Sequence, residues 1–148
     1  FAPNANSYRR LRPEMFAPVE PNWGANHRNV SLRIPVSDAR NLRFEHRVSG
    51  ADANPYLVTA AILSGVHYGI TNQCNPGKMI KEGEVISLNQ EIPNRWNKAI
   101  DQFEANKILP NYLGEEFCKS FVANRRFEEM EFNHNISDID YNWYLRSV

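Results

Sequence analysis

The chain has 148 residues, of which 42% are hydrophobic and 23% charged, as in an ordinary globular domain with a hydrophobic core. Seventeen basic and seventeen acidic side chains give a formal net charge of zero, which argues against a nucleic-acid-binding surface. No stretch reaches the roughly 18 apolar residues of a membrane span and no secretory leader is evident, so we expect a cytoplasmic protein without membrane or nucleic-acid partners. Cys74 and Cys118 lack the spacing of a zinc or redox motif, and we expect both to be reduced and packed.

The charged residues are distributed unevenly along the chain. Residues 1–50 contain eight arginines, no lysine and four acidic residues, whereas the remainder contains nine basic and thirteen acidic residues. Arginine makes planar, bidentate pairs with phosphate and carboxylate groups, whereas lysine acts as a point charge. The first third of the chain is therefore typical of a site that holds small anions in a fixed geometry.

The first half of the chain predicts loops and strands. Residues 1–29 are rich in proline, asparagine and glycine, so we expect a loop throughout. Apolar and polar side chains alternate in residues 30–35 and again in residues 42–48, which predicts two strands. The short connection between them favours an antiparallel hairpin.

The second half predicts helices. Asn54 followed by Pro55 is typical of a helix start, and this helix should end before Gly69. Because it is apolar nearly all round, we expect it to be buried. Asn94 can cap a second, amphipathic helix. The inward face of that helix would carry Trp96, Ala99, Ile100 and Phe103.

A third helix is expected over residues 115–131, and a terminal helix should follow a capping box formed by Ser137 and Asp140. The core-facing residues of the third helix would be Phe117, Phe121 and Val122. Together these elements predict an α+β fold in which an antiparallel strand pair from a larger sheet is covered by helices, with a helical C-terminal part.

Charged side chains occupy the polar faces of both predicted strands. Arg33 lies on the first strand, and Arg43, Glu45 and Arg47 share one face of the second. Such alternation usually means a solvated sheet face with weak ion pairs. Three guanidinium groups around one carboxylate instead favour a bound anion, such as a polyphosphate with its metal. Glu45 would then be a hard oxygen ligand for Mg²⁺ or Mn²⁺, while the arginines neutralise a transferring phosphoryl group.

Two histidines lie close to these charges in the sequence. His46 falls on the apolar face of its strand, so we interpret it as a core or interface residue rather than a ligand. His27 lies in the loop before the first strand, where a catalytic role is the less favoured interpretation.

Five ordered motifs resemble the catalytic domain of the glutamine synthetase family. They are Asn-Ser-Tyr-Arg-Arg-Leu at 6–11, Ala-Pro at 17–18, the run Asn-His-Arg-Asn-Val-Ser-Leu-Arg-Ile-Pro at 26–35, Arg-Phe-Glu-His-Arg at 43–47 and Ala-Asn-Pro-Tyr-Leu at 53–57. The resemblance covers essentially the whole chain, although the motifs become uninformative after about residue 69. It implies that residues 1–148 are the C-terminal part of a catalytic domain whose N-terminal portion lies outside this chain.

The resemblance also implies the reaction and the roles of particular residues. ATP would phosphorylate the glutamate side chain, and an amine would then attack the resulting γ-glutamyl phosphate. Glu45 matches a ligand of the second divalent metal. Arg28, Arg33 and Arg43 match arginines that contact the ATP phosphates, and Arg10 and Arg47 match those around glutamate and the γ-glutamyl phosphate. Arg28 and Arg47 would be catalytic, and the enzyme would form a ring-type homo-oligomer, a dodecamer by resemblance.

One departure from the family pattern bears on the amine. Glutamine synthetases proper carry a glutamate two residues before a proline in the segment after the Asn-Ser-Tyr motif, where this chain has Phe16. An ammonium site needs a negative wall, whereas an aromatic side chain suits an amine attached to a carbon chain, with Trp23 as further apolar surface. Phe16 is thus a candidate substrate-binding residue.

Arg-Arg at 9–10, Trp-Gly at 23–24, and residues 45–48 and 50–54 also look more like the γ-glutamylpolyamine and γ-glutamylputrescine synthetase branch, which is the preferred interpretation. Glutamine synthesis from ammonium is the first alternative, and a catalytically inactive structural or regulatory relative is the second. The complete set of site arginines and Glu45 argues against an inactive relative. We expect the isolated 148-residue chain to be inactive, because it contributes one of several metal ligands.

Overall fold

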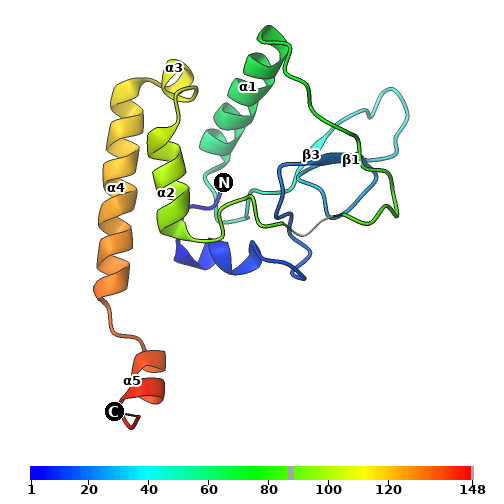
Figure 1. Ribbon diagram of the computed structural model, residues 1–148. Coiled ribbons are helices and arrows are strands. Elements are labelled where there is room, and N and C mark those ends of the chain that lie inside the picture. Colours follow the sequence, from blue (N-terminus) through cyan, green and yellow to red (C-terminus); the bar gives the residue numbers. More distant parts are fainter. Residues whose placement is uncertain (87–88, 148) are drawn as a thin grey trace.

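The computed structural model describes residues 1–86 and 89–147. A small sheet lies on one side of the molecule, and helix α1 stands between that sheet and a layer formed by α2 and α4 (Figure 1). In chain order, the elements of these described residues are the 3-10 helix η1 (Ala5–Arg10), β1 (Trp23–Ala25), β2 (Leu32–Ile34), β3 (Glu45–His46), α1 (Pro55–Thr71), α2 (Trp96–Ala105), α3 (Pro110–Leu113), α4 (Glu115–His134) and α5 (Asp138–Tyr144). The α+β class and the helical C-terminal part are confirmed.

The predicted hairpin is present but its strands are short. β2 and β3 pair antiparallel, with Leu32 opposite His46 and Arg33 opposite Glu45. The strands span fewer residues than the alternation at 30–35 and 42–48 suggests. Asp38 stabilises part of the connection between β2 and β3. Its carboxylate accepts hydrogen bonds from the backbone N–H groups of Arg40 and Asn41 at 3.1 and 3.0 Å.

The prediction of a continuous loop over residues 1–29 is wrong in two places. Asn4 caps η1 by accepting the backbone N–H groups of Asn6 and Ser7. Further along the chain, β1 pairs parallel to β2, and the backbone of Ile80 is hydrogen-bonded to the other side of β1. A Cβ at Gly24 would overlap the Ile80 carbonyl oxygen, so glycine permits this close approach.

Helix α1 begins as predicted but ends later. The side chain of Asn54 accepts the N–H groups of Tyr56 and Leu57 at 3.0 and 3.2 Å. The helix continues through Gly69 to Thr71, because an interior glycine costs only about 1 kcal/mol relative to alanine and does not by itself break a helix.

The expected burial of α1 is not observed. Its exposed side chains include Tyr56 at 83%, Leu63 at 61% and Ile70 at 74% accessibility. These positions recur every seven residues, so they form one apolar stripe along the helix. The opposite side of α1 packs against the rest of the chain, where Leu57, Val58 and Ala61 line a cavity shared with α2 and α4.

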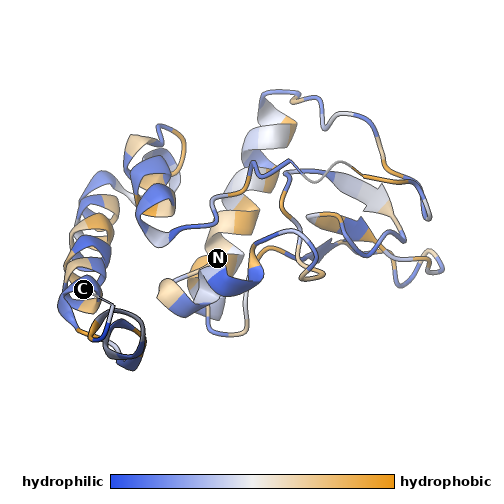
Figure 2. Cartoon of the chain, turned by 60° about the horizontal axis from the view of Figure 1, so that its bottom comes forward, coloured by the Kyte–Doolittle hydropathy of each residue, from blue (hydrophilic) through white to orange (hydrophobic). Residues whose placement is uncertain are grey.

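The α2 and α4 helices form the second part of the core. Ile100 on α2 is buried, and the rings of Phe103 and Phe121 lie 5.2 Å apart between their centroids. Phe117 contacts Phe121 at 6.0 Å but is 38% exposed, so it is only partly a core residue. Figure 2 shows apolar and polar residues alternating around both helices, as expected for amphipathic helices packed on one face.

Other details of the helical half correct the sequence expectations. Arg95, not Asn94, occupies the N-cap position of α2, and it makes no side-chain capping bond. The Ser137 and Asp140 capping box of α5 is present. Cys118 is buried as expected, whereas Cys74 is exposed. Among the described helices, none has the length and apolar character needed to cross a membrane.

Candidate active site

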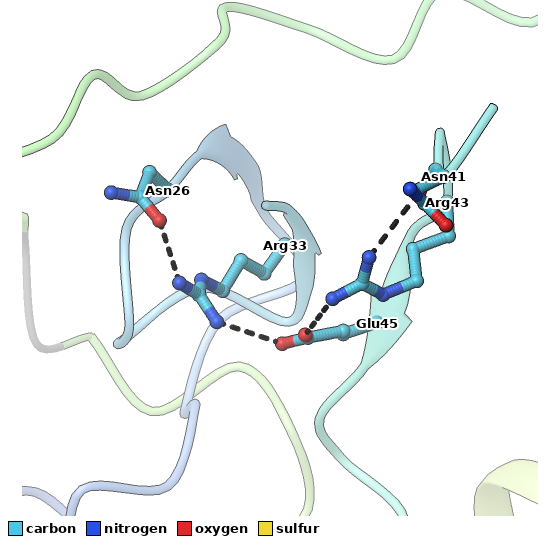
Figure 3. Close-up of polar contacts among 5 residues, drawn as sticks. All are labelled: Asn26, Arg33, Asn41, Arg43 and Glu45. Atoms are coloured by element: carbon cyan, nitrogen blue, oxygen red, sulfur yellow. Dashed lines mark hydrogen bonds and ion pairs between the residues drawn. The ribbon is translucent and has the colours of Figure 1, made fainter. Parts of the chain in front are cut away.

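The pairing of β2 with β3 places Arg33 directly opposite Glu45 (Figure 3). Arg33 Nη1 lies 3.0 Å from Glu45 Oε2, and Arg43 Nη2 lies 3.8 Å from Glu45 Oε1. Arg43 Nη1 also donates to the Asn41 carbonyl oxygen at 3.3 Å. The polar faces of the two strands therefore coincide, and one carboxylate lies between two guanidinium groups.

Asn26 was not predicted from the sequence as a site residue. Its side-chain oxygen accepts a hydrogen bond from Arg33 Nη2 at 2.6 Å, and its backbone N–H donates to the Ile34 carbonyl oxygen at 2.8 Å. The backbone of Asn26 has a φ of 53°, in the left-handed region that asparagine tolerates better than most residues. Arg33 is thus held from both sides, by Asn26 and Glu45.

The charges of this cluster are not balanced. Arg33 is 19%, Glu45 33% and Arg43 56% exposed at the side chain, so the pairs are partly shielded from water. Among the residues that the structure describes, the Nε atoms of Arg33 and Arg47 are buried and have no hydrogen-bond partner. Arg125 Nε on α4 and His46 Nδ1 are in the same state, but the donors of Arg33 and Arg47 adjoin a surplus of positive charge, and this combination favours an anionic ligand.

Arg10 and Arg47 lie on adjoining segments. The backbone N–H of Arg47 donates to the Ser31 carbonyl oxygen at 2.9 Å, which extends the β2–β3 pairing by one residue. Arg10, at the end of η1, donates from Nη2 to the carbonyl oxygen of Val48, the residue after Arg47. The two arginines predicted to surround the substrate are therefore connected through the backbone at 47–48.

Arg28 and Phe16 are not drawn into this cluster. Both side chains are exposed, Phe16 to 84%, and no hydrogen bond or ion pair within the described part of the chain joins either one to Glu45. Phe16 has a φ of 53°, an uncommon conformation for an aromatic residue. The roles predicted for these two residues stay predictions.

The two histidines have structural contacts. His27 is buried, its Nε2 lies 2.9 Å from the Glu84 carbonyl oxygen, and its Nδ1 accepts the Asn29 N–H at 3.2 Å. This pattern requires the proton on Nε2 and uses both ring nitrogens, so His27 joins the segment around Glu84 to the site loop. His46 packs against Phe1 with ring centroids 4.3 Å apart, and burial lowers its pKa.

Glu45 fits a divalent cation as one ligand of a larger set. Its carboxylate supplies the hard oxygen that Mg²⁺ and Mn²⁺ prefer. Within residues 1–86 and 89–147, no group of three or more His, Cys, Asp or Glu side chains could hold a metal ion. A metal at Glu45 would therefore need ligands in addition to those described for this chain.

The sequence profile of the glutamine synthetase catalytic domain matches residues 1–144. Gamma-glutamylputrescine synthetase PuuA of Escherichia coli (strain K12) is 43% identical over 150 residues, which cover 99% of this chain and 31% of that protein. Type-1 glutamine synthetase 2 of Dictyostelium discoideum is 35% identical over 157 residues, covering 100% of this chain and 29% of that protein. This chain thus spans under a third of the length of either relative.

Among solved structures, GmaS without ligand is similar to this chain, with a TM-score of 0.81 and 28% sequence identity. The match covers 98% of this chain and 34% of the GmaS chain. The similarity in structure therefore extends over the same residues as the similarity in sequence. This chain belongs to the glutamine synthetase catalytic domain family.

Proposed function

We propose that this chain is the C-terminal part of an ATP-dependent glutamate–amine ligase. The observation that carries the proposal is the cluster of Arg33, Arg43 and Glu45, with buried Nε donors of Arg33 and Arg47 left without a partner among the described residues. A polyphosphate with a divalent metal would balance the surplus positive charge and use these donors. Family membership supports this chemistry.

Two observations support a longer protein around this chain. The relatives are more than three times as long as the matched region. In addition, the apolar stripe of Tyr56, Leu63 and Ile70 on α1 is exposed here, although such a stripe is ordinarily covered in a folded protein. The remaining metal ligands and the adenine-binding residues would belong to that further part.

In the proposed reaction, a glutamate side-chain oxygen attacks the γ-phosphorus of ATP and ADP leaves. The amine nitrogen then attacks the acyl carbon of the γ-glutamyl phosphate, inorganic phosphate leaves, and the amine loses a proton. Glu45 would hold the metal, and Arg28, Arg33 and Arg43 would bind the ATP phosphates. Arg10 and Arg47 would bind glutamate and the phosphorylated intermediate, with catalysis supplied mainly by positioning and charge neutralisation.

The acceptor is proposed to be a polyamine or putrescine. This choice is supported by the relative named gamma-glutamylputrescine synthetase and by Phe16, which cannot provide a negative wall for ammonium. Glutamine synthesis is the second candidate, supported by the 35% identical relative named glutamine synthetase.

Full-length protein supplied with ATP, glutamate and Mg²⁺ should release phosphate faster with putrescine or spermidine than with ammonium at matched concentrations. Phe16→Glu should reduce this preference by about tenfold, because one misplaced charge in an apolar contact is worth about 1.4 kcal/mol or more. Phe16→Leu is the matched control that keeps an apolar side chain. Preference of the unmodified protein for ammonium would favour glutamine synthesis, and no turnover with any amine would favour an inactive relative.

We also propose that the full-length protein is a ring-shaped homo-oligomer. Supporting this, α5 is set apart from the rest of the molecule (Figure 1) and exposes Trp143 at 65% and Tyr144 at 57%, and Leu145, which follows α5, is 71% exposed. Aromatic residues of this kind are enriched at interfaces. Light scattering of the full-length protein should give a mass of many subunits, and a monomeric mass would contradict the proposal.

A further inference from the structure

A polar contact joins the N-terminal 3-10 helix to the segment that follows β3. Asp52 Oδ2 accepts hydrogen bonds from Ser7 Oγ at 2.6 Å and from Asn4 Nδ2 at 3.3 Å. Ser7 is only 3% exposed, so this contact is shielded from water on the Ser7 side. Donation by Ser7 lowers the pKa of Asp52, with smaller contributions from Asn4 and Arg10, although burial opposes the shift. Asp52 is therefore an anion at neutral pH.

Gly50 lies between Asp52 and Arg10. A Cβ added at Gly50 would overlap Asp52 Oδ1 and would lie 3.2 Å from Nη2 and 3.3 Å from Nε of Arg10. The Arg10 guanidinium also donates to the Val48 carbonyl oxygen. Residues 48–52 thus interact with the Arg10 guanidinium in three ways. The Val48 carbonyl oxygen accepts a hydrogen bond from it, Gly50 leaves room for it by lacking a side chain, and the Asp52 carboxylate attracts it electrostatically.

We propose that Gly50 and Asp52 are positioning residues that hold Arg10 in the orientation in which it binds glutamate. This inference rests on the proposed function, in which Arg10 contacts that substrate. An arginine side chain has many rotamers, and fixing it before the substrate arrives removes an ordering cost from binding. Because Val48 follows Arg47 directly, the same contact joins the Arg10 guanidinium to the backbone next to the other substrate arginine.

The alternative is that the hydrogen bonds from Ser7 and Asn4 to Asp52 only stabilise the packing of residues 48–52 against η1. The two roles predict different changes in the kinetic constants. A structural fastening lowers stability or all kinetic constants together, whereas a positioning role acts on glutamate binding through Arg10 and leaves ATP binding unchanged. A double-variant comparison separates them, because two changes that act through one group are not additive.

The test uses the full-length enzyme and measures KM for glutamate, KM for ATP and kcat. Gly50→Ala should raise the glutamate KM by about tenfold or more, since an added methyl group displaces a charged donor from its acceptor, with the ATP KM unchanged. Asp52→Asn should act in the same direction. Gly69→Ala is the matched control and should change neither KM, because a Cβ added at this helical glycine would meet no atom within 4 Å beyond the local backbone of its own helix.

Arg10→Lys is the reference variant. If it leaves the glutamate KM unchanged, the proposed role of Arg10 fails, and the positioning role fails with it. If Arg10→Lys raises that KM but Gly50→Ala and Asp52→Asn do not, the positioning role alone is overturned. The double variant Gly50→Ala with Arg10→Lys should be no worse than Arg10→Lys, and additive losses would also overturn it. Should Gly50→Ala fail to fold, Asp52→Asn decides by the same criteria.

Discussion

Glu45→Gln should lower glutamate-dependent ATP turnover of the full-length protein by about 10²-fold or more and should weaken Mn²⁺ binding. Glutamine keeps the shape of the side chain but removes the charge that faces Arg33 and Arg43 at 3.0 and 3.8 Å. The proposed metal would lose a hard anionic ligand, and the two guanidinium groups would repel each other. Loss of a preorganised charge next to a transferring phosphoryl group has effects of this size.

The measurement is phosphate release at saturating ATP and glutamate, together with Mn²⁺ titration followed by electron paramagnetic resonance. Glu131→Gln, an equivalent charge change on the exposed C-terminal part of α4, is the control and should have wild-type turnover. Unchanged turnover in Glu45→Gln would remove this carboxylate from the site. Lost turnover with unchanged Mn²⁺ affinity would restrict its role to orienting Arg33.

The centre of the site was predictable because strand alternation determines which side chains share a face. A period of two places Arg33, Arg43 and Glu45 on polar faces, and the antiparallel pairing then brings Arg33 opposite Glu45. Neither step depends on contacts far away in the sequence. The fold class followed from the same local signals, namely alternation in one half and helical periodicity with Asn54 and the Ser137 capping box in the other.

The missed features depend on residues far apart or on backbone conformation. β1 contains only three residues and is stabilised by β2 and by Ile80, so its own sequence has too little pattern to reveal it. Asn26 contributes through a left-handed backbone that turns its side chain toward Arg33, and the only available signal was the tolerance of asparagine for that conformation. Gly50 matters through the absence of a side chain, which no periodicity records.

The incorrect prediction that α1 is buried has a different cause. An apolar composition indicates that a helix packs against other parts of a protein, but it does not indicate which residues cover it. Tyr56, Leu63 and Ile70 face solvent in this chain. The exposed stripe on α1 is one of the observations behind the proposal that residues 1–148 belong to a longer protein.

Arg47→Gln should reduce kcat by about 10²-fold or more while leaving the ATP KM within a few-fold of its original value. Arg47 follows Glu45 by two residues, so their side chains project from the same face of the extended segment. Among the described residues, no hydrogen bond or ion pair occupies the Arg47 guanidinium, whereas Nη1 and Nη2 of Arg33 bond Glu45 and Asn26, although Nε of both arginines has no partner. A donor left free in the resting enzyme is available to an oxygen that gains charge only during reaction.

Arg40→Gln is the matched control, because it removes the same charge from an exposed position in the connection between β2 and β3. Comparing the two variants separates the loss of a specific contact from the general effect of lowering the positive potential around the site. This general effect on kcat should be small and should decrease with added salt. A raised KM for glutamate or ATP with unchanged kcat in Arg47→Gln would mean that Arg47 binds ground state and transition state equally. That result would reassign Arg47 from a catalytic residue to a substrate-binding one and leave the charge on the transferring phosphoryl group to Arg33, Arg43 and the metal.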